Sequence, residues 1–248
     1  MDIPVKHKKC SIKTGIGVRI SPESMFDLFR NWCSRLGGIY TIVLLRRNNI
    51  ESKELRELEI KSLSAESIDS LRGYEGTAAR IYFSEFAHLV EPFAFRGRVY
   101  HPPDGPVNVM LSLGYTMLYN RIATMLKDKG FNARIGFYHK GRGAHNALAS
   151  DLLEELRHIV ERIVLSLIHL NEISASDFSV IKRKNTDVCR MEGEGFRKYV
   201  RRFEKTMAQK ASYYGGGKMS YNAYLDEMAG SLKRSFKLNI PYKAMRID

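Results

Sequence analysis

The sequence predicts a mainly α protein with a small mixed α/β segment at its N-terminal end. Apolar residues recur at helical spacing in 74–90, and residues 106–126 are apolar around most of a helical circumference. A helix of that kind is usually covered on several sides, which places 106–126 at the centre of a bundle. Residues 147–170 complete the pattern with a third long helix, apolar at 148, 152, 156, 159, 160, 163 and 167.

The composition is that of a globular protein. Of the 248 residues, 44% are hydrophobic and 27% charged, which excludes disorder and collagen-like repeats. Three widely spaced cysteines build neither a disulfide framework nor a four-cysteine zinc site, so a reducing cytoplasm is expected. The first ten residues lack the apolar stretch of a signal peptide, and no window reaches about eighteen uninterrupted apolar residues. We therefore expect no membrane anchorage.

The N-terminal region, residues 1–63, is the mixed α/β part of this prediction. Ser21 is suited to cap a helix and Pro22 to occupy its first position. Within the region we expect a strand or arm at 10–20, a helix at 21–36, a strand at 39–45 and a connecting helix or linker at 46–63.

The second region, residues 64–248, is predicted to be an α-helical domain. A proline pair closes a loop before the central helix, and Gly130 ends that helix. Two further amphipathic helices are expected at 194–207 and 220–236.

The net charge indicates a polyanionic partner. Forty Lys and Arg residues against 27 Asp and Glu residues leave a formal charge of +13. Nucleic acid, an anionic membrane surface and a ribosome-like scaffold all fit such an excess, so charge alone does not choose among them.

Acidic residues inside apolar helical segments need explaining against this basic background. Glu75 is such a residue, and Gly73 and Gly76 beside it are expected to permit close approach of another backbone.

A second acidic group lies in the third long helix. Asp151 and Glu154 are three residues apart, which puts both carboxylates on one helical face, and His139 precedes them by a glycine-rich connection. Two carboxylates and an imidazole suit Mg²⁺ or Mn²⁺, an ion that phosphodiester chemistry uses. Favourable placement near the positive end of the helix dipole is the alternative for the acidic pair.

Four segments resemble a known family in order and spacing. They are GYEGTAARIYF (73–83), RGRVYHPPDGPVNVMLSLGYTMLY (96–119), GFYHKGRGAHNALASDLLEELR (136–157) and DVCRMEGEGFRKYVRRFEKTM (187–207). Together they resemble the CRISPR-associated Cas1 family, the DNA-integrating subunit of CRISPR adaptation, over roughly residues 64–248. The fold that this resemblance implies is a helical catalytic lobe.

The resemblance also implies the site. The family glutamate falls on Glu75, its histidine on His139 and its final acidic ligand on Glu154, while Asp151 matches a neighbouring acidic position that supports the site. We count all four as candidate metal residues for Mg²⁺ or Mn²⁺, with Glu75, His139 and Glu154 as the catalytic set. His139 is either a ligand or a proton shuttle to the leaving oxygen.

The activity that the resemblance implies is integration. Such proteins join the 3′-hydroxyl of a short DNA to a phosphodiester at the border of a repeat, in a prokaryotic cytoplasm. The implied partners are spacer and repeat DNA, a second copy of the chain and a Cas2-family protein. A casposase-like transposon integrase and a non-catalytic nucleic-acid-binding scaffold are the alternatives.

Basic residues are the candidates for holding DNA. Around the motifs they are Arg96, Arg98, Lys140 and Arg142. On the helix at 194–207 a basic stripe comprises Arg197, Lys198, Arg201, Arg202 and Lys205. Contact with phosphates is the functional interpretation, and solvated surface charge is the alternative for any single member.

The N-terminal region departs from the family. Members usually carry a β-rich domain there that forms the dimer and meets the partner protein, and few residues before Glu75 read as strands. Either this is a piece of a longer polypeptide or the β region is reduced. Fusion of the helical lobe to a reverse transcriptase fits the second arrangement.

Overall fold

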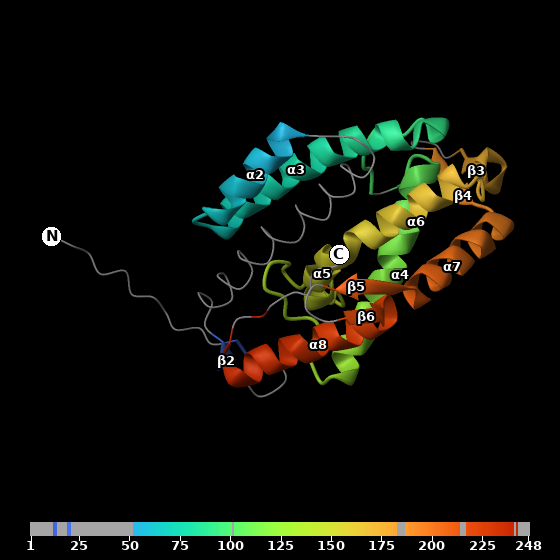
Figure 1. Cartoon of the computed structure of the whole chain (residues 1–248). Helices are drawn as coiled ribbons and strands as arrows, with labels where there is room; N and C mark the ends of the chain where they lie inside the picture. Colours follow the sequence, from blue (N-terminus) through green and yellow to red (C-terminus); the bar gives the residue numbers. More distant parts are fainter. Residues whose placement is uncertain are drawn as a thin grey trace.

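A computed structural model describes residues 52–100, 102–182, 187–213, 217–240 and 242, with the backbone of 12–13 and 19–20 (Figure 1). The helices are α2 (Lys53–Leu63), α3 (Ile68–Leu89), α4 (Pro106–Asp128), α5 (Ala147–Leu153), α6 (Arg157–His169), α7 (Gly193–Ala208) and α8 (Tyr221–Leu238). Short 3₁₀ turns are η1 (Glu91–Phe93), η2 (Glu154–Leu156) and η3 (Ala175–Asp177). The mainly α class is confirmed.

The described strands form three separate antiparallel pairs. They are β1 (Ile12–Lys13) with β2 (Arg19–Ile20), β3 (Phe178–Ile181) with β4 (Val188–Met191), and β5 (Lys210–Tyr213) with β6 (Gly217–Ser220). In register, Phe178 faces Met191, Lys210 faces Ser220, and Ile12 faces Ile20.

The N-terminal expectations are only partly covered by the described residues. The β1–β2 pair lies within the strand or arm expected at 10–20, and α2 lies within the connecting segment expected at 46–63. The helix expected at 21–36 and the strand expected at 39–45 lie outside the described part of the chain.

Helix α4 is central, as its apolar circumference predicts. It contacts α5, α6, α8 and β4, and in Figure 1 it crosses the middle of the molecule between α3 and the α7–α8 side. Gly105 caps it in extended conformation and Pro106 occupies its first turn, where a missing N–H costs nothing. Met110, Leu118 and Leu126 are completely buried along its length.

The long helix predicted over 147–170 is interrupted. The chain forms α5, then the 3₁₀ turn η2, and α6 starts at Arg157 after Leu156 leaves helical geometry at φ −117° and ψ 4°. The prediction of one continuous helix is therefore wrong at 154–156. The turn sends adjacent carboxylates in different directions: Glu155 is buried against the hydroxyls of Tyr224 and Tyr242, each 2.7 Å away, while Glu154 stays partly exposed.

Helices α4, α6 and α7 meet at Gly114. A Cβ built there would lie 2.2 Å from the Tyr199 hydroxyl oxygen and 2.5 Å from Val160 Cγ1. Tyr199 is fully buried, and among the described residues its hydroxyl has no hydrogen-bond partner. Burial raises the pKa of Tyr199 above its usual value.

Within the described residues, no helix has the length and apolar character to cross a bilayer.

Gly114→Ala is expected to destabilise the protein by about 1–3 kcal/mol because the added methyl group overpacks this crossing. Adding Tyr199→Phe should recover part of the loss, since it removes the oxygen nearest to the new Cβ. Urea unfolding measures both effects. Gly230→Ala in α8 is the matched control, because its nearest neighbour is the flexible Arg234 guanidinium at 3.6 Å. Unchanged stability of Gly114→Ala would contradict the packing.

Candidate functional site

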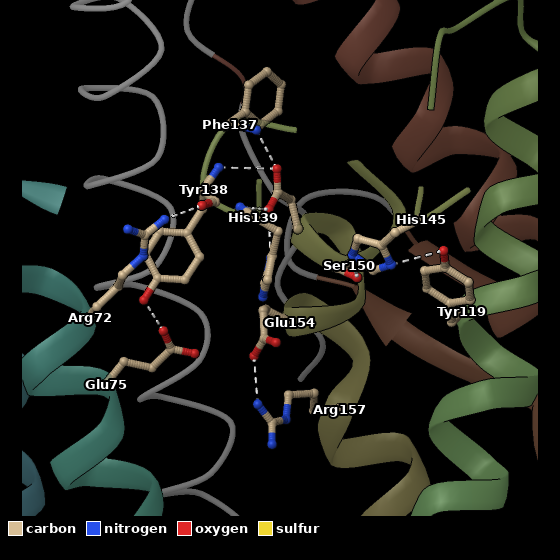
Figure 2. A network of polar contacts seen from close by, with 11 residues as sticks. Arg72, Glu75, Tyr119, Phe137, Tyr138, His139, His145, Ser150, Glu154 and Arg157 are labelled. Atoms are coloured by element: carbon tan, nitrogen blue, oxygen red, sulfur yellow. Dashed lines mark hydrogen bonds and ion pairs between the residues drawn. The ribbon is translucent and has the colours of Figure 1, made fainter. Parts of the chain in front are cut away.

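The buried carboxylate of Asp151 organises the loop that carries His139. Asp151 has no exposed surface, and its carboxylate accepts backbone hydrogen bonds from Phe137, Tyr138 (3.3 Å) and His139 (2.9 Å) (Figure 2). His139 Nδ1 adds a fourth bond of 2.8 Å. An ionised carboxylate offers about four acceptor positions, so these donors fill its capacity.

The orientation of His139 follows from that bond. Because Asp151 only accepts, Nδ1 carries the proton, and the other ring nitrogen of a neutral imidazole keeps its lone pair. Figure 2 shows the ring reaching toward Glu154. Burial lowers the pKa of His139, but the hydrogen bond and charge of Asp151, together with the charges of Glu154 and Glu75, raise it, and the net shift is upward.

Glu75 is held from the same loop. The Tyr138 hydroxyl donates to Glu75 Oε2, while the Tyr138 carbonyl accepts a 2.6 Å bond from Arg72 Nη2. The Arg72 guanidinium also lies over the Tyr138 ring, 5.0 Å from its centroid. Burial, followed by the charge of Glu154, raises the pKa of Glu75.

Glu154 is positioned by the residue that begins α6. Arg157 Nη1 donates to Glu154 Oε2 at 3.0 Å, and both side chains are mostly buried. Burial would lower the pKa of Arg157, yet Glu154 raises it well above its usual value. The second carboxylate is thus supplied from η2 with its own counter-charge.

Glu75, His139 and Glu154 therefore come from three segments and feel one another's charge. Glu154 raises the pKa of both other groups, and Glu75 contributes to the shift of His139. In the described part of the chain, no three acidic, histidine or cysteine side chains already form a metal cluster. Their donor set, two carboxylates and one imidazole, fits Mg²⁺ or Mn²⁺, since hard oxygen ligands suit both ions and imidazole favours Mn²⁺.

Asp151 differs from the sequence-based expectation. The expectation counts it among the metal residues, but its oxygens are occupied by the donors of residues 137–139. Its geometry is that of a residue that orients a ligand.

The glycines beside Glu75 also differ from expectation. A Cβ at Gly73 or Gly76 would meet no described atom within 4 Å, and both glycines are exposed. Within the described residues, no other backbone approaches Gly73 or Gly76 closely, so that prediction is wrong.

The motif-flanking cations divide into two kinds. Arg96, Lys140 and Arg142 are exposed. Arg98 is engaged internally, donating to Asn108 Oδ1 at 2.9 Å and to Ser112 Oγ at 3.0 Å.

The basic stripe of α7 divides in the same way. Arg202 is paired with Glu172 and is mostly buried, and Lys198 Nζ bonds the buried Asp177 at 2.9 Å. Arg197 pairs with Glu194 at the surface. Arg201 and Lys205 are exposed, while Tyr199 and Phe203 pack inward.

Several supporting residues escaped sequence reasoning. Tyr138 adjoins His139 and Arg157 follows Glu154 by one helical turn, so adjacency was the available signal. Glu161 stands out as an acid in the longest apolar stretch, and its carboxylate accepts from the Tyr82 and Tyr115 hydroxyls at 2.7 and 2.9 Å. Burial raises the pKa of Glu161.

Comparison with known proteins shows which family this sequence resembles. The sequence model for CRISPR associated protein Cas1 matches residues 40–205. CRISPR-associated endonuclease Cas1 of Mycobacterium tuberculosis is 36% identical over 186 residues, 73% of this chain and 54% of the relative. CRISPR-associated endonuclease Cas1 2 of Rhodospirillum rubrum is 43% identical over 120 residues, 46% of this chain and 35% of the relative. The chain thus spans about half the length of such relatives.

Solved structures share the fold. A chain of the Cas6-RT-Cas1–Cas2 complex superposes with a TM-score of 0.74 at 30% identity, over 87% of this chain and 25% of that one. A casposase bound to integration product gives a TM-score of 0.75 at 24% identity, over 88% of this chain and 64% of that one.

Asp151→Asn is expected to lower the free energy of unfolding by about 3 kcal/mol. The amide has one acceptor oxygen, so its own N–H₂ would face backbone N–H groups and leave buried donors unpaired. Asp69→Asn, at an exposed carboxylate of α3, is the control and should change little. Thermal unfolding measures both, and equal shifts would contradict the role of Asp151.

Proposed function

The chain belongs to the CRISPR-associated protein Cas1 family, and from that premise we propose that it is a divalent-metal-dependent DNA integrase and endonuclease. It joins the 3′-hydroxyl of a spacer DNA to a repeat phosphodiester by transesterification. The convergence of Glu75, His139 and Glu154 from three segments carries this proposal, and the residue after His139, Lys140, is an exposed cation.

Glu75, His139 and Glu154 hold Mg²⁺ or Mn²⁺ in this proposal. When bound, the ion supplies Lewis-acid stabilisation of charge at the scissile phosphate. Tyr138 and Asp151 keep Glu75 and the imidazole in place, so little reorganisation is needed when DNA arrives.

Arg157 balances charge in the site. The Glu154 carboxylate raises the pKa of Glu75, so the two carboxylates repel, and Arg157 offsets part of that repulsion through its bond to Glu154. Cationic and anionic groups are thus already arranged where a phosphodiester and a metal would share the site.

DNA is held by the exposed cations. Arg96, Lys140 and Arg142 lie in the motif segments, and Arg201 and Lys205 add exposed cations on α7. Each phosphate contact releases counterions, which makes binding sensitive to salt. Arg98 and Arg202 are engaged with internal partners and are left out of the DNA-binding set that we propose.

Partners follow from the relatives. One of the similar structures is a Cas6-RT-Cas1–Cas2 complex, so we propose a Cas2-family partner and association with a reverse transcriptase. We also propose a homodimer, which the family resemblance implies. With DNA as substrate, the chain works in a prokaryotic cytoplasm.

A casposase-like transposon integrase is the second candidate, favoured by the TM-score of 0.75 to a casposase. The two differ in target: a repeat border for one and a transposon target site for the other.

Glu75→Gln or His139→Ala should lower Mn²⁺-dependent strand transfer on a branched DNA by on the order of 100-fold or more, because a metal ligand is lost. A chelator should have the same effect on the wild type, and duplex binding should persist. Glu85→Gln, ten residues along α3, serves as control. Undiminished transfer in both variants would sink the catalytic assignment.

Arg201 and Arg202 form a matched pair for DNA binding. Arg201→Ala should reduce the slope of log binding constant against log salt by about 1, as expected for one lost phosphate contact. Arg202→Ala should instead lower the melting temperature and leave the slope unchanged, since its charge is paired with Glu172. Filter binding at several salt concentrations measures the slopes. A reduced slope in Arg202→Ala with an unchanged slope in Arg201→Ala would refute the prediction.

A further inference from the structure

Two arginine side chains lie against the ring of Tyr115. The Arg98 Cζ is 5.5 Å and the Arg157 Cζ 5.3 Å from its centroid. Arg98 also lies over the ring of Tyr100 at 4.4 Å, and Tyr100 is 54% exposed. We call this continuous stack of Tyr100, Arg98, Tyr115 and Arg157 the arginine–tyrosine ladder. It runs from the surface loop before α4 to the candidate metal site.

The outer part of the ladder is rigidly anchored. Arg98 Nη1 donates to Asn108 Oδ1 at 2.9 Å and to the Val99 carbonyl at 3.0 Å, and Nη2 donates to Ser112 Oγ at 3.0 Å. Asn108 in turn donates to the Gly97 carbonyl at 3.0 Å. Because a guanidinium presents its N–H groups in a fixed plane, these bonds set both the position and the tilt of Arg98.

The inner part of the ladder ends on a metal-ligand candidate. Tyr115 is fixed through its hydroxyl, which donates to Glu161 at 2.9 Å, and Glu161 is only 2% exposed. Arg157 lies against that ring and bonds Glu154 at 3.0 Å. The plane of Tyr115 therefore limits where the Arg157 guanidinium can lie.

We propose that Arg98 is a positioning residue for the metal site: through Tyr115 it fixes Arg157, and Arg157 in turn orients Glu154. The inference rests on the proposed function, because the orientation of Glu154 matters when Glu154 binds a metal ion.

Two physical effects support this role. Stacking against the same ring gives both guanidinium groups a preferred position. Their like charges also repel, whereas the Glu154 carboxylate attracts Arg157, so the two neighbours of Arg157 act on it with opposite sign. Lysine would keep the charge but not the planar face or the fork of donors, so Arg98→Lys separates positioning from charge.

The test is calorimetric titration of Mn²⁺ alone into the whole chain. Arg98→Lys should weaken Mn²⁺ binding by about 3- to 10-fold, less than the 10- to 100-fold typical of a direct partner of a metal ligand. Tyr115→Leu should weaken it as well. Arg98→Lys should add little in the Tyr115→Leu background, because the ladder is already interrupted. Duplex DNA affinity should stay unchanged.

Arg121→Lys is the matched control. Arg121 also lies over a ring, that of Phe203 at 5.4 Å, and bonds Asn222 at 2.8 Å and Glu204 at 2.5 Å, none of which belongs to the ladder. This control should lower the melting temperature without changing Mn²⁺ affinity. Equal losses of Mn²⁺ affinity in Arg98→Lys and Arg121→Lys would overturn the proposal, because Arg98 would then act through general stability.

Further results of these titrations would also overturn the proposed role of Arg98. Wild-type Mn²⁺ affinity with weakened duplex binding in Arg98→Lys would make Arg98 a DNA contact and overturn the inference. If circular dichroism shows that Arg98→Lys does not fold, Tyr115→Leu against Arg121→Lys decides by the same criteria. A wild-type chain that binds no Mn²⁺ overturns both proposals. A wild-type chain that binds Mn²⁺ but has no strand-transfer activity contradicts only the proposed function.

Discussion

The buried carboxylate of Asp151 is the constraint on which the candidate site depends. It gathers the donors of residues 137–139, and the chain permits this only because position 136 is glycine: a Cβ there would lie 2.7 Å from Asp151 Oδ2 and 2.7 Å from the His139 carbonyl. The bond to Nδ1 then fixes which imidazole nitrogen faces the site. One buried charge thereby joins α5 to the loop before it.

Each proposed ligand has its own anchor, and the anchors come from different parts of the fold. Tyr138 holds Glu75, Asp151 holds His139, and Arg157 holds Glu154. Helix α4 connects these parts, since it packs against both α5 and α6 and carries Tyr115 of the ladder. The cations behind the net charge of +13 accordingly fall into two groups: some are exposed, and others, such as Arg157 and Arg202, are paired with acidic side chains.

The sequence predicted the helices better than the partners of the charged side chains. Helical periodicity is local, and two of the four motif segments carry the ligand candidates: 73–83 contains Glu75, and 136–157 contains His139 and Glu154. Whether a charge is paired depends on contacts between distant residues: Tyr138 and Glu75 are 63 positions apart, and Arg202 and Glu172 are 30 apart. The break at 154–156 was hidden for the same reason, because Glu155 is drawn to tyrosines from far along the chain.

The central claim is that Glu75, His139 and Glu154 bind one divalent ion while Asp151 only orients His139. Anomalous diffraction at the manganese edge, from crystals of the chain grown with Mn²⁺, tests it most directly. We expect an anomalous peak within coordination distance of those three side chains, with Asp151 still bonded to the 137–139 backbone. A peak coordinated by Asp151, or one placed away from all three side chains, would contradict the account.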